Sequence, residues 1–279
     1  MKLPGGLLLD GKLCHDITFK PITGELERVI CESCCQYGSL VEQVTAILTH
    51  TIDRVANVVA DKFLILKLSS GDRHFLVQQL EAILYPHPKW LTVNCNDCNE
   101  LIQLQLQPGA LPVKPANNCF PKTSVTLSIG TVETRVPTGA DEQAISEQSD
   151  SSKNLLNQLL HRIVTRSNEA IDIEKLTDDD LALLDKTVED MMPQVGDAIA
   201  TLCPYCNKEQ QVSIDIYEWI SGSSYNLDEE IHSIASHYHW SEQEILTLPR
   251  YRRKRYLQLI NSNLHKTDDY NSIGNGEMR

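Results

Sequence analysis

Two pairs of cysteines constrain this chain more than any other feature of its sequence. Two residues separate Cys95 from Cys98, and Cys203 and Cys206 repeat that spacing 108 residues later. Such a gap lets a tight turn direct two thiolates at one tetrahedral ion, and two such turns supply a complete four-cysteine shell. The spacing therefore predicts one structural zinc ion held by all four cysteines.

The sequences around the two pairs are alike. Strand-like residues precede each pair at 91–93 and 198–202, and alternating apolar and polar residues follow at 101–106 and 211–216. Alternation of this kind is typical of a half-buried strand. We therefore expect two strand–turn–strand halves that meet in one zinc-ribbon-like module, with residues 107–197 inserted between them.

Two other readings of these cysteines stay open: thiols that pack or oxidise without metal, and the redox pair of a thiol oxidoreductase. A redox pair is expected to open a helix after a strand, whereas strand-like sequence follows both pairs here. Four thiolates also leave zinc no open position for water or substrate. The sequence shows no phosphate-binding loop, zinc-protease motif or nucleophile elbow. We expect a protein that is not an enzyme and has no small-molecule substrate.

Other potential ligands have simpler explanations. Cys31, Cys34 and Cys35 continue a helix that starts near Glu25, where a two-residue gap is one turn. Free thiols are expected there, and metal binding is the alternative. His237 and His239 end another predicted helix, where histidine suits the negative end of the dipole, again with ligation as the alternative.

Composition bounds the remaining possibilities. The 279 residues are 41% hydrophobic, enough for a substantial core in one large or two modest domains. No apolar stretch has the length of a membrane span, and the first residues do not resemble a secretory signal. The nine cysteines are odd in number and several lie in predicted helices or strands. We expect a cytoplasmic location and no membrane partner.

Charge is unevenly distributed along the chain. The net charge is −13, and residues 140–200 carry fourteen acidic but only five basic side chains. This balance argues against long-range attraction to nucleic acid. The exception is a run of cations on a predicted helix, where not all of them can share one face. With Trp240 they predict a partner-binding surface; the alternatives are a nucleic-acid-binding zinc ribbon and an ordinary solvated helix. The run comprises Arg250, Arg252, Arg253, Lys254 and Arg255.

The fold class predicted is α+β, mostly helical, with an N-terminal β-hairpin about Asp10-Gly11 and the zinc-ribbon-like module. Helical spacing covers most of 25–86, and Thr177 and Ser241 each begin a capping box. Trp240 is placed to pack on Ile245, and Pro249 is expected to split the last helix into 242–248 and 250–264. The predicted segments are a hairpin at 1–24, helices at 25–89, the first knuckle and β segment at 90–137, an acidic helical insertion at 138–197, the second knuckle at 198–219 and C-terminal helices at 220–279.

Several short motifs together resemble the T4-type phage base plate protein family. They are Leu3-Pro4-Gly5-Gly6, Asp10-Gly11, Thr23-Gly24-Glu25, Pro137-Thr138-Gly139-Ala140-Asp141, both cysteine pairs, His237 to Ser241, Glu244 to Pro249, and Arg252-Arg253 with Tyr256. The chain departs from that pattern after each knuckle, where Asn99 and Asn207 replace a common glycine. Asparagine tolerates the left-handed backbone, so the turns are expected to survive.

This resemblance implies a structural or assembly protein of the baseplate hub of a contractile phage tail or a phage-tail-like injection system. The partners implied are other baseplate, hub or spike proteins, and the protein could become part of the assembled particle. Neither the motifs nor the spacing chooses between a permanent subunit and a factor that leaves after assembly.

Overall fold

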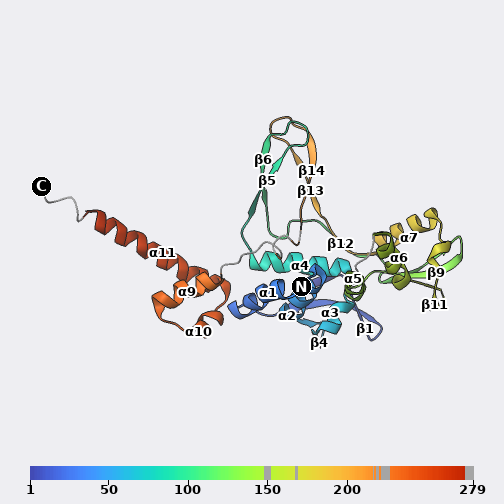
Figure 1. The fold of residues 1–279 in the computed structure, drawn as a ribbon, viewed down its shortest axis with the longest axis horizontal. Coiled ribbons are helices and arrows are strands. Elements are labelled where there is room, and N and C mark those ends of the chain that lie inside the picture. The colour runs from blue at the N-terminus through green and yellow to red at the C-terminus, as the bar shows by residue number, and fades with distance from the viewer. Residues whose placement is uncertain (148–151, 167–168, 216, 218–219, 221–226, 274–279) are drawn as a thin grey trace.

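The computed structural model describes residues 1–147, 152–166, 169–215, 217, 220 and 227–273. Ile216, which ends the last predicted strand, lies outside these residues, as do short parts of the predicted segments 138–197, 198–219 and 220–279. Figure 1 shows four parts. We call them the body (residues 1–84 and 139–147), the arm (89–106 and 198–213), the lobe (122–135, 152–166 and 169–191) and the C-terminal unit (227–273).

The body begins with the predicted hairpin. Strands β1 (Lys2–Leu9) and β2 (Lys12–Phe19) are antiparallel, and Asp10 and Gly11 between them have φ values of 47° and 77°. Positive φ at both central residues is the geometry of a type I′ turn, which matches the twist of the flanking strands. The N-terminal β-hairpin predicted from the sequence is confirmed.

Two further strands extend this sheet in the order β1-β2-β3-β4: β3 (Ile52–Val55) and β4 (Val58–Val59). They interrupt the region 25–86, for which the sequence predicts mostly helix. Ile52 and Val55 are fully buried, and Val55 pairs with Ile17 of β2. β-branched residues fit a buried strand well, so tertiary pairing overrides the helical spacing here.

Five helices pack around this sheet: α1 (Gly24–Gln36), α2 (Leu40–Thr51), α3 (Lys62–Lys67), α4 (Ser70–Leu84) and α5 (Gly139–Ser146). The first four begin at side chains that accept a backbone N–H, namely Thr23, Ser39, Asp61 and Ser69. Their apolar faces meet in one core, in which Ile47, Leu48, Leu76 and Leu80 have no exposed surface.

The lobe combines a sheet with helices α6 (Ser152–Ile163) and α7 (Asp178–Met191). Its strands run in the order β11-β10-β9-β8, and are β8 (Lys122–Leu127), β9 (Gly130–Arg135), β10 (Val164–Arg166) and β11 (Glu169–Ala170). A 3₁₀ turn (Ile173–Lys175) precedes α7. The capping box of Thr177 and Asp180 is confirmed, and Asp180 also accepts the backbone N–H of Ser128 at 2.8 Å. That second bond ties α7 to the sheet.

Two short strands, β7 (Val113–Lys114) and β12 (Gln194–Val195), pair where the lobe returns to the body.

The C-terminal unit follows, with α9 (Leu227–Tyr238), α10 (Glu242–Leu246) and α11 (Arg250–Ile273). The split at Pro249 and the capping box of Ser241 and Glu244 are confirmed. Trp240 packs against the cluster that contains Ile245, as predicted. No helix in the described ranges has the length and apolarity needed to cross a membrane.

Candidate metal centre

The arm consists of two β-hairpins that project together from the body (Figure 1). In the first, β5 (Lys89–Asn94) pairs with β6 (Leu101–Leu106); in the second, β13 (Ala198–Leu202) pairs with β14 (Glu209–Ser213). The two-residue gap of each cysteine pair lies in the turn of its hairpin. The second hairpin thus repeats the first, as the flanking sequences predict.

The two turns share the same backbone geometry. Asn99 and Asn207 follow the second cysteine of each pair in the left-handed region, with φ values of 59° and 58°. The Asn99 N–H donates to the carbonyl of Cys95 at 3.0 Å, and the Asn207 N–H donates to that of Cys203 at 2.9 Å. Asparagine adopts this conformation more readily than most residues, so both turns form without glycine, as expected from the sequence.

The four sulfur atoms converge at the tip of the arm. The Sγ atoms of Cys95 and Cys206 are 3.7 Å apart, those of Cys98 and Cys203 are 3.6 Å apart, and all four lie within 4.8 Å of one another. Tetrahedral coordination with Zn–S bonds of about 2.3 Å would place sulfurs roughly 3.8 Å apart. The four cysteines could therefore hold one metal ion.

Backbone groups make this site suitable for thiolates. The backbone N–H of Asp97 lies 3.4 Å from Cys95 Sγ, and that of Tyr205 lies 3.4 Å from Cys203 Sγ. The backbone N–H groups of Cys98 and Asp97 lower the pKa of Cys95 to about 6. At Cys98 and Cys206 a backbone N–H also lowers the pKa, but burial and neighbouring cysteine side chains outweigh it and raise the pKa of both thiols. Because metals bind the thiolate, donors that stabilise the anion favour ligation. Cys95 and Cys203 are also buried, with 3% and 0% of their surface exposed.

Little else joins the two hairpins. The apolar cluster at the tip contains Ile102 with Val93 and Leu104, besides three of the cysteines. Across the hairpins, the Asn96 N–H donates to Gln210 Oε1 at 3.1 Å, and Lys208 forms an exposed ion pair with Asp97. An exposed pair of this kind contributes at most about 1 kcal/mol. The cysteine group is therefore the main connection between the two tips.

The other predicted ligands lie elsewhere. Cys31 and Cys34 lie on α1, where burial raises the pKa of Cys31 to about 11 and also raises that of Cys34. His237 belongs to the last turn of α9, and His239 follows that helix. Within the described part of the chain, only Cys95, Cys98, Cys203 and Cys206 form a group of three or more His, Cys, Asp or Glu placed to hold a metal.

The basic run of α11 divides between the interior and the surface. Arg253 has no exposed surface; its Nη2 lies 2.7 Å from Glu27 of α1 and its Nε lies 3.3 Å from Glu230 of α9. This corrects the expectation that Arg253 faces a partner. Its charge is satisfied inside the molecule because two buried carboxylates surround it, and the pairs fix the C-terminal unit to the body.

The remaining cations of the run point in different directions. Arg250 pairs with Glu27 at 3.3 Å, and Lys254 pairs with Glu230 at 2.6 Å. Arg252 donates to the Tyr256 hydroxyl at 3.5 Å, and the Tyr256 ring lies 4.9 Å from that of Trp240. Arg252 and the half-buried Trp240 thus share one side of the unit.

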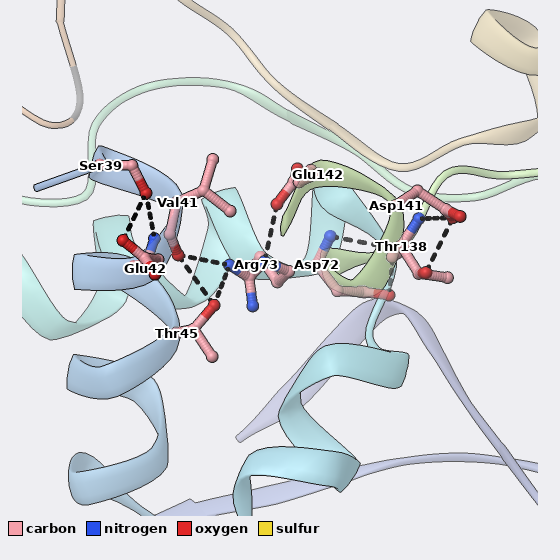
Figure 2. A network of polar contacts seen from close by, with 10 residues as sticks. Ser39, Val41, Glu42, Thr45, Asp72, Arg73, Thr138, Asp141 and Glu142 are labelled. Atoms are coloured by element: carbon pink, nitrogen blue, oxygen red, sulfur yellow. Dashed lines mark hydrogen bonds and ion pairs between the residues drawn. The ribbon is translucent and has the colours of Figure 1, made fainter. Parts of the chain in front are cut away.

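A buried polar junction between α4 and its neighbours was not predicted (Figure 2). Asp72 accepts the backbone N–H of Gly5 at 2.8 Å, and burial raises the pKa of this carboxyl. Arg73 donates to Glu142 of α5 at 3.0 Å and to Thr45 of α2 at 2.9 Å. Polar residues in the first turn of a helix ordinarily face solvent. The buried role of Asp72 and Arg73 is visible only from their hydrogen-bond partners, which lie far from them in the sequence.

Comparison with known proteins gives a family match. Residues 7–218 match a family model described as T4 bacteriophage base plate protein. The match spans both cysteine pairs and ends before α9, so the resemblance of residues 237–256 stays a prediction. No curated protein and no solved structure matches the chain.

Proposed function

The chain belongs to the family of T4 bacteriophage base plate proteins, as its motifs predict, and on this premise we propose that it is a non-enzymatic structural or assembly protein of the baseplate hub of a contractile phage-tail-like particle. The observation that carries the proposal is the family match over 7–218, which includes the body, the arm and the lobe. In this role the protein works by holding other subunits.

We further propose that the arm binds one structural zinc ion through Cys95, Cys98, Cys203 and Cys206. The sulfur separations of 3.6 and 3.7 Å support this, because they suit tetrahedral zinc. A shell of four thiolates has no open position, so the ion would fix the arm and activate no water. Two-stranded hairpins are marginally stable alone, and a shared ion would hold this pair together.

The partner-binding surface that we propose uses the exposed side of the C-terminal unit, with Trp240, Arg252 and Arg255. Trp240 is stacked against Tyr238 with ring centroids 5.3 Å apart, and Arg252 lies beside it through Tyr256. Rigid aromatic rings with a neighbouring arginine are typical of residues that dominate binding energy at protein interfaces. The nucleic-acid alternative loses support because Arg253, Arg250 and Lys254 already neutralise carboxylates.

Affinity purification of the tagged full-length protein from cells that produce the particle, followed by mass spectrometry, tests the function. We expect hub or spike components in near-stoichiometric amounts, and a marked loss of them from Arg252→Glu. The matched control is Arg54→Glu, because Arg54 is an exposed arginine of the body. Recovery of no tail component with the unchanged protein would contradict the proposal.

The same preparation separates the two roles that the family allows. A permanent subunit stays in particles purified to completion at constant stoichiometry, whereas an assembly factor is present in partial assemblies and absent from finished particles. Quantitative mass spectrometry of both fractions decides between them.

A further inference from the structure

A groove of about 1000 Å³ lies between the body and the start of α11. Three segments line it: the end of β2 with the residues that follow, the end of α4 with the linker after it, and the first two turns of α11. Its apolar surface comes from Phe19, Ile22, Ile83, Leu84 and Tyr251. Tyr251 is 75% exposed, so this surface is available to a partner.

Two cations unpaired within the described ranges, Lys20 and Arg255, give the groove a positive charge in a chain whose net charge is −13. Five cations line it, and no carboxylate does so among the described residues: Lys20, Lys89, Arg250, Lys254 and Arg255. Three of the five pair with carboxylates that lie outside the lining, Lys89 with Glu81, Arg250 with Glu27 and Lys254 with Glu230. Within the described part of the chain, Lys20 and Arg255 have no ion-pair partner. A concave apolar surface lined by one sign of charge attracts the opposite sign and focuses its approach. The groove therefore fits an acidic segment that also carries an apolar side chain.

Helix α7 of the lobe has this composition. Its solvent face presents five exposed carboxylates that form no ion pair within the described residues, and one cation, Lys186. Leu183 lies among them with 44% of its surface exposed. The five are Asp178, Asp179, Asp185, Glu189 and Asp190. Spacing of three and four residues places Asp179 and Asp190 on the same side of the helix as Leu183.

The start of α11, which lines the groove, and α7 lie on opposite sides of the body (Figure 1). A chain therefore cannot place its own α7 in its own groove. A second copy can, and contact between two different surfaces of identical chains joins them head to tail, which produces a ring or an open filament.

We propose that the acidic face of α7 from one copy docks in the basic groove of another, with Leu183 against the apolar surface and the carboxylates near Lys20 and Arg255. The inference needs only the chain itself and does not depend on the assignment to a baseplate. Because the attraction is between exposed charges, it weakens as salt shortens the screening length.

Sedimentation velocity of the purified, metal-replete protein tests this in about 0.01 M and about 1 M salt, where the screening length falls from about 30 Å to about 3 Å. We expect species heavier than a monomer that increase with concentration at low salt and disappear at high salt. A monomer at low salt over the whole concentration range would overturn the proposal.

Two double variants then locate the contact. Lys20→Ala with Arg255→Ala removes the unpaired charge of the groove, and Asp179→Asn with Asp190→Asn removes the charge from the side of α7 that carries Leu183. Neutral substitutions are used because charge reversal on both surfaces would create a new complementary pair in the mixture. We expect each variant alone to associate about a hundredfold more weakly. An equimolar mixture should stop at a one-to-one dimer, because one chain keeps its α7 and the other keeps its groove.

The behaviour of the mixture shows whether α7 of a second copy is what occupies the groove. A mixture that stays monomeric, or a groove variant that still assembles alone, would contradict docking of α7. A different result would assign the groove to nucleic acid. In that case the unchanged protein stays monomeric at low salt and binds a labelled DNA duplex, and the groove variant does not bind the duplex.

Discussion

At the scale of the residue, the junction of α4 shows how close contact decides which side chain is tolerated. Gly71 lies in the first turn of α4, where alanine would ordinarily favour the helix. A Cβ atom at this position would lie 1.8 Å from the carbonyl oxygen of Pro193. Backbone cannot move aside as a flexible side chain can, so helix propensity and packing demand different residues and packing prevails.

Gly71→Ala is therefore expected to lower the free energy of unfolding by about 3 kcal/mol, because Pro193, which directly precedes β12, must shift away from α4. Urea denaturation measures the change. Gly38→Ala is the matched control, since nothing lies within 4 Å of a Cβ there. Equal stability of the two variants would show that Pro193 does not pack on α4 in solution.

Asp141 illustrates a charged residue whose partners outweigh its burial. Burial by itself would raise the pKa of this carboxyl, but the Arg135 guanidinium, the Thr138 backbone N–H and Arg162 together hold it far below its usual range. Arg135 lies 2.7 Å away and Arg162 lies 2.8 Å away. The carboxylate thus joins α5 of the body to β9 and α6 of the lobe.

Asp141→Asn should lower the free energy of unfolding by about 2–4 kcal/mol at neutral pH, since the buried charge-assisted bonds are lost. The folded pKa is depressed, so the stabilisation is complete above the unfolded value of about 3.9 and is lost as pH falls toward the folded pKa. Urea denaturation at a series of decreasing pH values should show that the free energies of unfolding of the unchanged protein and Asp141→Asn become equal. A difference that stays constant with pH would exclude the ionised carboxylate as its source, and Asp185→Asn serves as the exposed control.

At the scale of the element, the C-terminal unit is attached to the body by charge. Arg253 of α11 reaches Glu27 of α1 and Glu230 of α9, and its Nη1 donates to the carbonyl of Leu248 at 2.8 Å. Pro249 lies between α10, which ends at Leu246, and α11, which begins at Arg250, and so separates the two helices. The direction of α11 follows from these contacts and from the packing of Tyr256, Leu257 and Ile260 in the apolar cluster with α9 and α10.

Glu27→Gln should loosen the C-terminal unit while leaving the body folded, because Arg253 and Arg250 lose a buried counter-charge. Removing one partner of a buried pair costs about 3–5 kcal/mol, and Glu230 offsets part of this for Arg253. Hydrogen exchange should accelerate in α9 and α10 and stay unchanged in α2. Glu32→Gln on the same helix is exposed and should have no effect, and protection of α9 that survives Glu27→Gln would contradict the prediction.

At the scale of the whole molecule, the cysteine group brings together two cysteine pairs that are 108 positions apart in the sequence. A shared metal ion would therefore close a loop of that length. Everything between the hairpins, including the lobe, is an insertion between the two halves. Joining distant segments removes conformational freedom from the unfolded chain, which is one way a bound ion stabilises a fold.

Cys95→Ser is expected to reduce bound zinc from one ion per chain to almost none and to lower the melting temperature, as should a strong chelator acting on the unchanged protein. Elemental analysis and calorimetry measure both effects. Cys119→Ser is the control, because this exposed cysteine lies outside the group. Unchanged protein that purifies without metal and melts at the same temperature with chelator would rule out a structural ion.

The sequence by itself determined the features whose physics is complete within a few residues. The Asp10-Gly11 turn, the capping boxes at Thr177 and Ser241 and the break at Pro249 each depend on backbone angles and hydrogen bonds of neighbouring residues. The two cysteine gaps belong here as well, since each gap defines its own turn. These signals are readable because no distant part of the chain is needed to satisfy them.

Only the tertiary structure decided which distant segments meet. It made strands of 52–55 and 58–59, joined β8 and β9 to β10 and β11, and placed Arg253 inside between Glu27 and Glu230. A run of five cations looks the same whether it faces water or buried carboxylates, because the counter-charges lie up to 226 residues away. Burial and partner choice are properties of the packed molecule, so they follow from long-range contacts and not from local spacing.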